Sequence, residues 1–324
     1  MKKIAIEEHF ITKAIVDHAV APRALDGKIK NRLLNDYIEK SSLDLGEGRL
    51  RVMDEAGIDM EVLQVGVQGY GFFDGPNGTA MAIKTNDELS NVVKKYPERF
   101  AGFAALAPQD PGSAADELER AVKELGLKGA QMCSNVDGEY LDNEKFWVIY
   151  ERAEKLGVPI YIHPSWPSPD ILKPFMTYPV LGFSMWGFSA DAGLSAMRLI
   201  CSGVFDKYPG LKFILGHLGE ALPWWIWRLD NRWEKFTADD RGRQTKKKPS
   251  QYIKENFFIT TSGMFWHPSL LCAYLTLGAD RILFAVDYPY ELNREAVEFM
   301  EVMPICDSDK EKIYHLNAEE LLVL

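Results

Sequence analysis

The sequence contains few cysteines and no long apolar run. Its four cysteines lie far apart and form no Cys-x-x-Cys pair, so we expect free thiols and a cytoplasmic location rather than a disulfide framework. No stretch approaches the roughly 18 apolar residues that a membrane span requires. The first apolar run is interrupted by Glu7 and Glu8 after three residues, and we therefore expect neither a signal peptide nor a membrane segment.

Positive charge is also scarce. The chain has 37 Lys and Arg against 47 Asp and Glu, which gives a formal net charge of -10 and a pI near 5.2. This balance argues against nucleic acid or an anionic membrane as a partner, although a metal ion or a local arginine can still attract a small anion. We interpret the basic run at residues 239–250 as a solvated surface loop.

Short apolar runs alternate with helical patterns along the chain. The runs are continuous rather than alternating, which is typical of parallel strands buried on both faces. Between them, stretches such as 86–96 and 114–126 carry acidic residues early and lysines late, as helices prefer. The predicted strands are residues 3–10, 60–67, 100–108, 129–135, 159–165, 212–220, 256–263 and 281–289.

This order predicts an α/β fold in which residues 1–324 form a single (β/α)₈ TIM barrel domain. A doubly wound open sheet is the structural alternative, but the glycine-rich phosphate turn expected after its first strand is missing. We expect residues 10–48 to be irregular and without a strand. The Gly- and aromatic-rich loop at 69–79 is either a lid over the site or a rigid surface turn.

Polar side chains occupy the C-terminal ends of several predicted strands, which meet on one face of a barrel. Glu7 and His9 are two residues apart on a strand, so both side chains point to the same side. With His163 and Asp287 they supply two imidazoles and two carboxylates, a ligand set that suits one divalent Zn²⁺ or Mn²⁺ ion. Glu8 points to the opposite face, and we interpret it as structural.

The sixth predicted strand ends in His217 and Glu220, which also belong to this face. The other three histidines fall in helices or a loop, and we interpret His18, His267 and His315 as ordinary residues.

Five motifs in this order resemble the amidohydrolase superfamily, and in particular its aminocarboxymuconate-semialdehyde decarboxylase branch. That branch includes nonoxidative decarboxylases of hydroxybenzoates, and the resemblance extends over nearly the whole chain. The motifs are EEHF at 7–10, IHP at 162–164, GHLGE at 216–220, TTSG at 260–263 and DYPYE at 287–291.

The resemblance implies the same ligands: Glu7, His9, His163 and Asp287. It also implies one metal ion rather than two. Hydrolytic members begin with His-x-His and carry a bridging lysine at the end of the fourth strand, whereas Lys128 precedes that strand here. At Cys133 the chain departs from the γ-resorcylate decarboxylases, which carry a polar asparagine there. The resemblance therefore implies the reaction class better than the ring substitution.

The activity implied by the resemblance is metal-dependent nonoxidative decarboxylation of a hydroxybenzoate-type acid. Asp287 would protonate the ring carbon if it arrives protonated. His217 would orient the substrate or relay the proton. Glu220 would set the tautomer of His217, or would instead be a carboxylate at a helix N-terminus.

Three further residues are candidates for substrate contact. Arg228 could hold a carboxylate or Glu220, with a surface arginine as the alternative. Trp186 and Phe188 could line an aromatic pocket, or could simply pack in the core.

Two other functions stay open at this point. The same centre could serve a hydrolase of a small lactone, ester or amide, in which Asp287 would deprotonate the attacking water. A non-catalytic ligand-binding barrel stabilised by a metal is the third hypothesis. For the partners we expect a small aromatic carboxylate as substrate, no nucleic acid, no membrane and a homo-oligomer, either a dimer or a tetramer.

Overall fold

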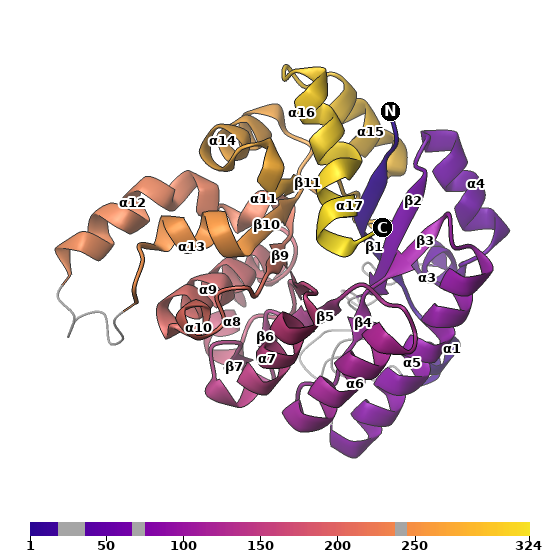
Figure 1. Cartoon of the computed structure of the whole chain (residues 1–324), viewed down its shortest axis with the longest axis horizontal. Coiled ribbons are helices and arrows are strands. Elements are labelled where there is room, and N and C mark those ends of the chain that lie inside the picture. Colours follow the sequence, from indigo (N-terminus) through magenta and orange to yellow (C-terminus); the bar gives the residue numbers. More distant parts are fainter. Residues whose placement is uncertain (19–35, 67–74, 237–244) are drawn as a thin grey trace.

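Parallel strands form a closed barrel in the computed structural model, which describes residues 1–18, 36–66, 75–236 and 245–324 (Figure 1). One sheet has the order β1-β2-β3 and the other the order β11-β10-β9-β8-β5-β4, and every pair within them is parallel. The strands are β1 (Ile4–Phe10), β2 (Met60–Val65), β3 (Phe100–Gly102), β4 (Ala104–Ala105), β5 (Ala130–Cys133), β8 (Ile160–His163), β9 (Phe213–Leu215), β10 (Phe257–Thr260) and β11 (Ile282–Leu283).

The two sheets join at both edges. Only Phe103 separates β3 from β4, so these two form one bent strand that belongs to both sheets. At the other seam, the backbone N–H of Ile6 donates to the carbonyl of Phe284 (3.1 Å), and that of His9 donates to Tyr288 (2.7 Å). The segment after β11 therefore closes the barrel against β1. A small antiparallel hairpin, β6 (Asn135–Val136) and β7 (Glu139–Tyr140), follows β5.

Helices surround the barrel, and α12 and α13 extend from it as an arm at the left of Figure 1. Short helical turns lie at Glu144–Phe146, Pro179–Gly182, Ala279–Arg281 and Lys312–Leu316. The helices are α1 (Lys13–His18), α3 (Asp36–Leu43), α4 (Glu47–Ala56), α5 (Gly75–Lys95), α6 (Pro111–Lys123), α7 (Trp147–Leu156), α8 (Pro169–Phe175), α9 (Gly187–Ser202), α10 (Val204–Lys207), α11 (His217–Glu220), α12 (Leu222–Lys235), α13 (Pro249–Asn256), α14 (His267–Leu277), α15 (Asn293–Glu301), α16 (Asp307–Glu311) and α17 (Asn317–Leu322).

The eight predicted strands and the predicted barrel are confirmed, with β3 and β4 together forming the third strand. Within 10–48 the described residues after β1 are helices and their connections, and no strand occurs among them. Most of the predicted loop at 69–79 lies outside the described residues, and its last part begins α5. The run at 239–250 is described only from residue 245, and it leads into α13. That residues 1–324 form a single domain stays a prediction.

The core has an inner and an outer layer. The outer layer lies between the strands and the helices. The inner layer fills the barrel, and α17 adds Ala318 and Leu322 to it at the end where β1 begins. Its other buried members are Ile4, Ile6, Val62, Ala101, Phe103, Tyr161, Ile214, Phe258, Leu283 and Ala285.

An extra residue in β1 orients the side chains of the EEHF motif. The register against β2 shifts between Ala5 and Glu8. Ala5 pairs with Glu61 and Glu8 pairs with Leu63, so β1 advances three residues over a distance in which β2 advances two. A bulge of this kind lets two successive residues face the same side. Ile6 accordingly belongs to the inner layer, and the Glu7 carboxylate also lies inside the barrel, bonded to the Tyr161 hydroxyl. Glu8 is left on the outer side of the strand, where it meets the segment after β11.

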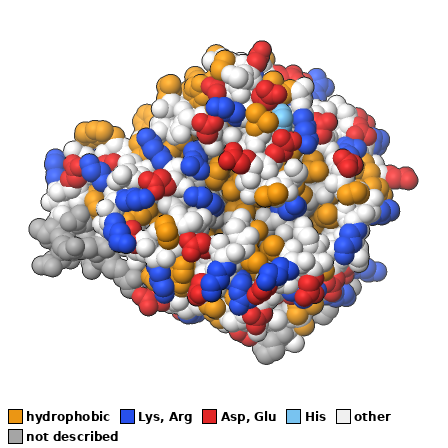
Figure 2. Space-filling model, in the orientation of Figure 1, with side chains coloured by type: hydrophobic (Ala, Val, Ile, Leu, Met, Phe, Trp, Pro, Cys, Tyr) orange, Lys and Arg blue, Asp and Glu red, His pale blue; other side chains and the backbone are white. Residues whose placement is uncertain are grey.

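The described surface carries both signs of charge. Figure 2 shows Lys and Arg side chains interspersed with Asp and Glu over one face of the molecule. Among the described residues, no helix is both long and apolar enough to cross a membrane. None of the four cysteines is in a disulfide.

Gly129 provides a test of how tightly the barrel wall is packed. Its φ is +155°, and a Cβ at this position would lie 2.5 Å from the carbonyl oxygen of Pro159. We expect Gly129→Ala to lower the free energy of unfolding by about 3 kcal/mol or more, because backbone strain and overpacking add. Gly126 also has a positive φ (+78°) but has no atom within 4 Å of a built Cβ. The control Gly126→Ala should therefore cost only about 1–2 kcal/mol in urea denaturation. Equal losses of unfolding free energy in the two variants would contradict this description of the barrel wall.

Candidate metal centre and active site

Four side chains from three separate parts of the chain meet at one end of the barrel. Glu7 and His9 come from β1, His163 ends β8, and Asp287 follows β11. One potential ligand atom from each residue lies within 4.8 Å of all the others. Glu7, His9 and His163 are buried and Asp287 is partly exposed. The structure thus brings together the four residues that the sequence predicts as metal ligands.

The two oxygens of the Glu7 carboxylate have different surroundings. Oε2 accepts hydrogen bonds from the hydroxyl groups of Tyr161, Thr260 and Ser262, with the Thr260 bond at 3.3 Å. Oε1 is buried, has no hydrogen-bond partner in the described part of the chain, and lies 3.5 Å from Nε2 of His163. Burial raises the pKa of Glu7, and the charge of His217 offsets part of that rise. A buried, unpartnered carboxylate oxygen of this kind is suited to bind a cation.

The two imidazoles present their Nε2 atoms to the same space. Nδ1–H of His163 donates to the carbonyl of Pro164 (2.6 Å), which makes Nε2 the ring nitrogen with the lone pair, as a metal ligand requires. Burial and the neighbouring His9 lower the pKa of His163 well below its usual value, so the ring is neutral. Its Nε2 lies 3.3 Å from Nε2 of His9. Two nitrogens that each lie about 2.0–2.1 Å from one tetrahedral ion would be about 3.3 Å apart. The spacing fits a shared ion.

Asp287 connects this group to His217. Its Oδ1 lies 2.8 Å from Nε2 of His9, and its Oδ2 lies 3.7 Å from Nε2 of His217. Burial raises the pKa of Asp287, but the hydrogen bonds from His217 and His9 outweigh burial and hold that pKa well below its usual value. The carboxyl group is therefore ionised in the structure, so the proton that Asp287 would donate must reach it from another group.

A left-handed turn positions His217 and Glu220. Residues 217–221 all have positive φ values, between 49° and 77°, and only Gly219 among them is a glycine. Each non-glycine residue in this conformation costs roughly 1–2 kcal/mol. The turn places Nδ1 of His217 2.7 Å from Oε1 of Glu220. Of the two roles left open for Glu220, this contact favours the one that acts on His217, by accepting a hydrogen bond from its Nδ1–H.

His217 holds a proton at this centre. Burial lowers the pKa of His217, but the charges of Glu220 and Glu7 and the hydrogen bond to Asp287 raise it, and the net result lies well above the usual value. The imidazole is therefore charged, with Nδ1–H directed at Glu220 and Nε2–H directed at Asp287. The His217–Glu220 pair thus carries a proton beside the ionised carboxylate of Asp287.

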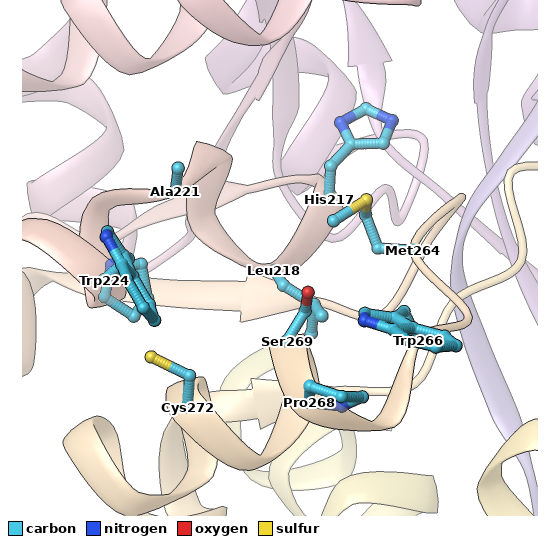
Figure 3. A pocket seen from close by; sticks show the side chains of 10 residues that line it. His217, Leu218, Ala221, Trp224, Met264, Trp266, Pro268, Ser269 and Cys272 are labelled. Carbon is cyan, nitrogen blue, oxygen red and sulfur yellow. The ribbon is translucent and has the colours of Figure 1, made fainter.

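A cavity of about 380 Å³ adjoins His217 (Figure 3). Trp224 from α12 and Trp266, just before α14, stand on opposite sides of it, and Met264 lies near His217. None of the four predicted metal ligands lines the cavity, so it borders the centre rather than containing it. These walls were not predicted from the sequence. The available signal was the aromatic residues that follow the sixth and seventh strands.

The three predicted substrate-contact residues lie outside this cluster. Trp186 is 62% exposed and directly precedes α9. Phe188 packs edge-on against Trp166 at 5.7 Å between ring centres. Arg228 is exposed on α12, and Oε2 of Glu220 has no hydrogen-bond partner among the described residues. Of the two contacts left open for Arg228, the one with Glu220 is not formed among the described residues, and the one with a substrate carboxylate stays a prediction.

Two residues bear on the number of metal ions. Nζ of Lys128 donates to the carbonyl of Val323 (2.8 Å), near the C-terminus of the chain. Cys133 pairs in register with His163 at the end of β5. In the described ranges, the Glu7, His9, His163 and Asp287 cluster is the group found capable of holding a metal, which agrees with one ion rather than two.

Comparison with known proteins places the chain in a family. A family model described as Amidohydrolase (Amidohydro_2) matches residues 39–324, so the chain belongs to this amidohydrolase family. The gamma-resorcylate decarboxylase of Polaromonas sp. (strain JS666 / ATCC BAA-500) is 39% identical over 333 residues, which cover 99% of this chain and 98% of the relative.

Solved structures of similar proteins support the same grouping. The 5-carboxyvanillate decarboxylase from Sphingomonas paucimobilis is 35% identical and gives a TM-score of 0.94, covering 100% of this chain and 99% of its own. The dihydroxybenzoic acid decarboxylase from Polaromonas sp. JS666 is 37% identical with a TM-score of 0.87, covering 100% of this chain and 97% of its own. That protein was crystallised with manganese and the inhibitor 2-nitroresorcinol. These similarities confirm the resemblance to hydroxybenzoate decarboxylases.

Replacement of a single ligand tests the centre. We expect His163→Ala to lose its metal on purification and to lose activity, because Nε2 of His163 has no substitute in the cluster. His267 stacks on Phe299 at 5.1 Å between ring centres and makes a suitable control. His267→Ala should keep its metal content by atomic absorption. If His163→Ala retained a full complement of metal, the ligand assignment would be wrong.

Proposed function

We propose that this protein is a metal-dependent nonoxidative decarboxylase of a hydroxybenzoate-type aromatic acid. One observation carries the proposal: the Asp287 carboxylate stands between a buried metal-ligand cluster and the charged His217–Glu220 pair. Full-length similarity to decarboxylases of hydroxybenzoates supports it.

The cluster of Glu7, His9, His163 and Asp287 would hold one divalent ion, Zn²⁺ or Mn²⁺. When bound, that ion acts as a Lewis acid toward the carboxylate and the ortho hydroxyl group of the substrate. The chain's own contribution is to fix the ligand atoms. The hydroxyls on Oε2 of Glu7 leave Oε1 for the metal, and Pro164 fixes the ring of His163.

Proton delivery is the second task of the site. Nε2–H of His217, which lies 3.7 Å from Oδ2 of Asp287 in the structure, passes its proton to that oxygen. Asp287 then transfers this proton to the ring carbon that bears the carboxylate. A C–H bond forms, the bond to the carboxylate carbon breaks, and its electron pair returns to the ring as CO₂ leaves. The reaction consumes one proton per turnover, and His217 recovers it from solvent.

Arg228, Trp186 and Phe188 stay predictions as substrate contacts. Trp186 and Arg228 are exposed in the single chain, so they would act at the outer part of the site.

Replacing Asp287 tests its role as the proton donor. We expect Asp287→Asn to lower kcat about 100- to 10,000-fold while an ortho-hydroxybenzoate still binds, because asparagine keeps the shape and an oxygen ligand but has no acidic proton. Asp280 is exposed and pairs with Lys312 far from the centre, so Asp280→Asn is the matched control and should keep its kcat.

The competing hydrolase reaction is distinguished by isotope labelling. In D₂O a decarboxylase places deuterium on the ring carbon vacated by CO₂, since that hydrogen comes from Asp287. A hydrolase of a lactone, ester or amide instead incorporates ¹⁸O from water into its product. Incorporation of ¹⁸O with an unlabelled ring would overturn the proposed function and leave the metal cluster standing.

We also propose that the protein forms a homo-oligomer, a dimer or a tetramer. Trp224 and Trp227 on α12 are 74% and 73% exposed, and soluble monomers seldom leave apolar patches of this kind uncovered. Light scattering should give two or four times the chain mass of 36.7 kDa, and Trp227→Lys should lower that mass. A wild-type protein that runs as a monomer at all concentrations would contradict this proposal.

A further inference from the structure

We infer that Glu8 is a positioning residue for Asp287, holding the backbone on both sides of it so that the carboxylate faces the metal cluster. This assignment goes beyond the structural role that the sequence suggested for Glu8. It rests on the proposed function of the centre, in which Asp287 is both ligand and proton donor.

The Glu8 carboxylate spans Asp287. Its Oε1 accepts a hydrogen bond from the backbone N–H of Val286 (2.8 Å), and its Oε2 accepts one from the N–H of Tyr288 (3.1 Å). Glu8 is completely buried, so water does not compete for these bonds. Both oxygens of one carboxyl group are thus used on the two peptide groups that flank Asp287. Burial and the neighbouring Glu61 raise the pKa of Glu8 well above its usual value, so the support rests on the geometry of these two bonds.

Asp287 needs such support because of its backbone conformation. Its φ is +80°, in the region that glycine prefers. A non-glycine residue there costs roughly 1–3 kcal/mol and persists only where the surrounding structure holds it. The N–H of Asp287 donates to the carbonyl of Glu7 (3.0 Å), and the N–H of His9 donates to Tyr288 (2.7 Å). These two bonds fix the chain in line with β1, and the two from Glu8 fix it from the outer side.

A buried arginine completes this outer layer. Nη1 of Arg49 donates to the carbonyl of His9 (2.7 Å), and its Nε lies 2.5 Å from Oε2 of Glu61. The guanidinium also lies over the ring of Tyr288, 4.8 Å from the ring centre. The outer face of β1 therefore holds the backbone of two ligand-bearing segments, while its inner face supplies the ligands. Along β1, the predicted metal ligands Glu7 and His9 therefore flank Glu8, which holds the backbone around Asp287.

Two roles for Glu8 predict different results. If Glu8 only seals the seam of the barrel, its replacement lowers stability and nothing else. If it positions Asp287, replacement also changes the ligand field at the metal and the rate of proton delivery. Glu117 offers a matched control, because it is also a buried carboxylate, but it lies on α6 and is bonded to Asn86 and Arg120 and not to the Asp287 segment.

The experiment compares Glu8→Gln with Glu117→Gln in protein loaded with Co²⁺, whose visible absorption reports ligand geometry. Glutamine at position 8 keeps one acceptor but sets an NH₂ group against the second backbone N–H. We expect Glu8→Gln to change the Co²⁺ spectrum and to lower kcat about 10- to 100-fold with little change in KM. Glu117→Gln keeps an acceptor for Asn86 and Arg120 and should lose a similar amount of Tm, with the wild-type spectrum and kcat.

The outcome decides between the two roles. A wild-type spectrum in Glu8→Gln, with no greater loss of kcat than in Glu117→Gln, would overturn the inference. If Glu8→Gln does not fold, Glu8→Asp keeps the carboxyl group but shortens the side chain by about 1.5 Å, too short for both bonds, and the same two readouts apply. Should the wild type release no CO₂ from any hydroxybenzoate, the proposed function fails, whereas the Co²⁺ spectra still decide the role of Glu8.

Discussion

The burial of carboxylates inside the barrel is the constraint on which the site depends. Glu7 is completely buried and Asp287 is only partly exposed, and an ionised carboxylate in such a place is unfavourable unless it is paired and hydrogen-bonded. Three hydroxyl groups satisfy one oxygen of Glu7, and His9 and His217 face Asp287. What remains is an unpartnered oxygen beside two imidazole nitrogens, and a divalent cation satisfies all three at once.

The barrel meets this constraint with a few local departures from regular backbone. The bulge in β1 faces Glu7 into the barrel directly after Ile6. The left-handed turn after β9 brings Glu220 onto His217. A positive φ at Asp287, held by Glu8, lets one carboxylate contact both His9 and His217. Such strain is concentrated where chemistry is expected, and the regular strands and helices around it provide the stability that tolerates it.

The sequence predicts the barrel and the ligands because both leave local signals. Continuous apolar runs mark buried parallel strands, and a polar residue at the end of such a run is conspicuous, as with His163 after Ile160–Ile162. The protonation states of Asp287 and His217 could not be predicted in this way. Asp287 is ionised and His217 charged because of their distances to each other and to Glu220, and those distances are set by tertiary packing.

Other features escaped prediction for related reasons. The clamp by Glu8 joins residues 278 positions apart in the chain, so no local pattern reveals it. Trp224 and Trp266 read as ordinary helix and loop residues until the structure places them across one cavity. Arg228 is the opposite case. A motif suggested a possible contact with Glu220, and the described residues do not form it.

The most direct test of the account is a crystal structure of the protein with Mn²⁺ and 2-nitroresorcinol, the inhibitor bound by the similar Polaromonas decarboxylase. The account predicts one anomalous peak contacted by Glu7, His9, His163 and Asp287, with the second oxygen of Asp287 facing the ring carbon that bears the nitro group. A peak bound by other residues, or an Asp287 carboxylate turned away from that carbon, would contradict it.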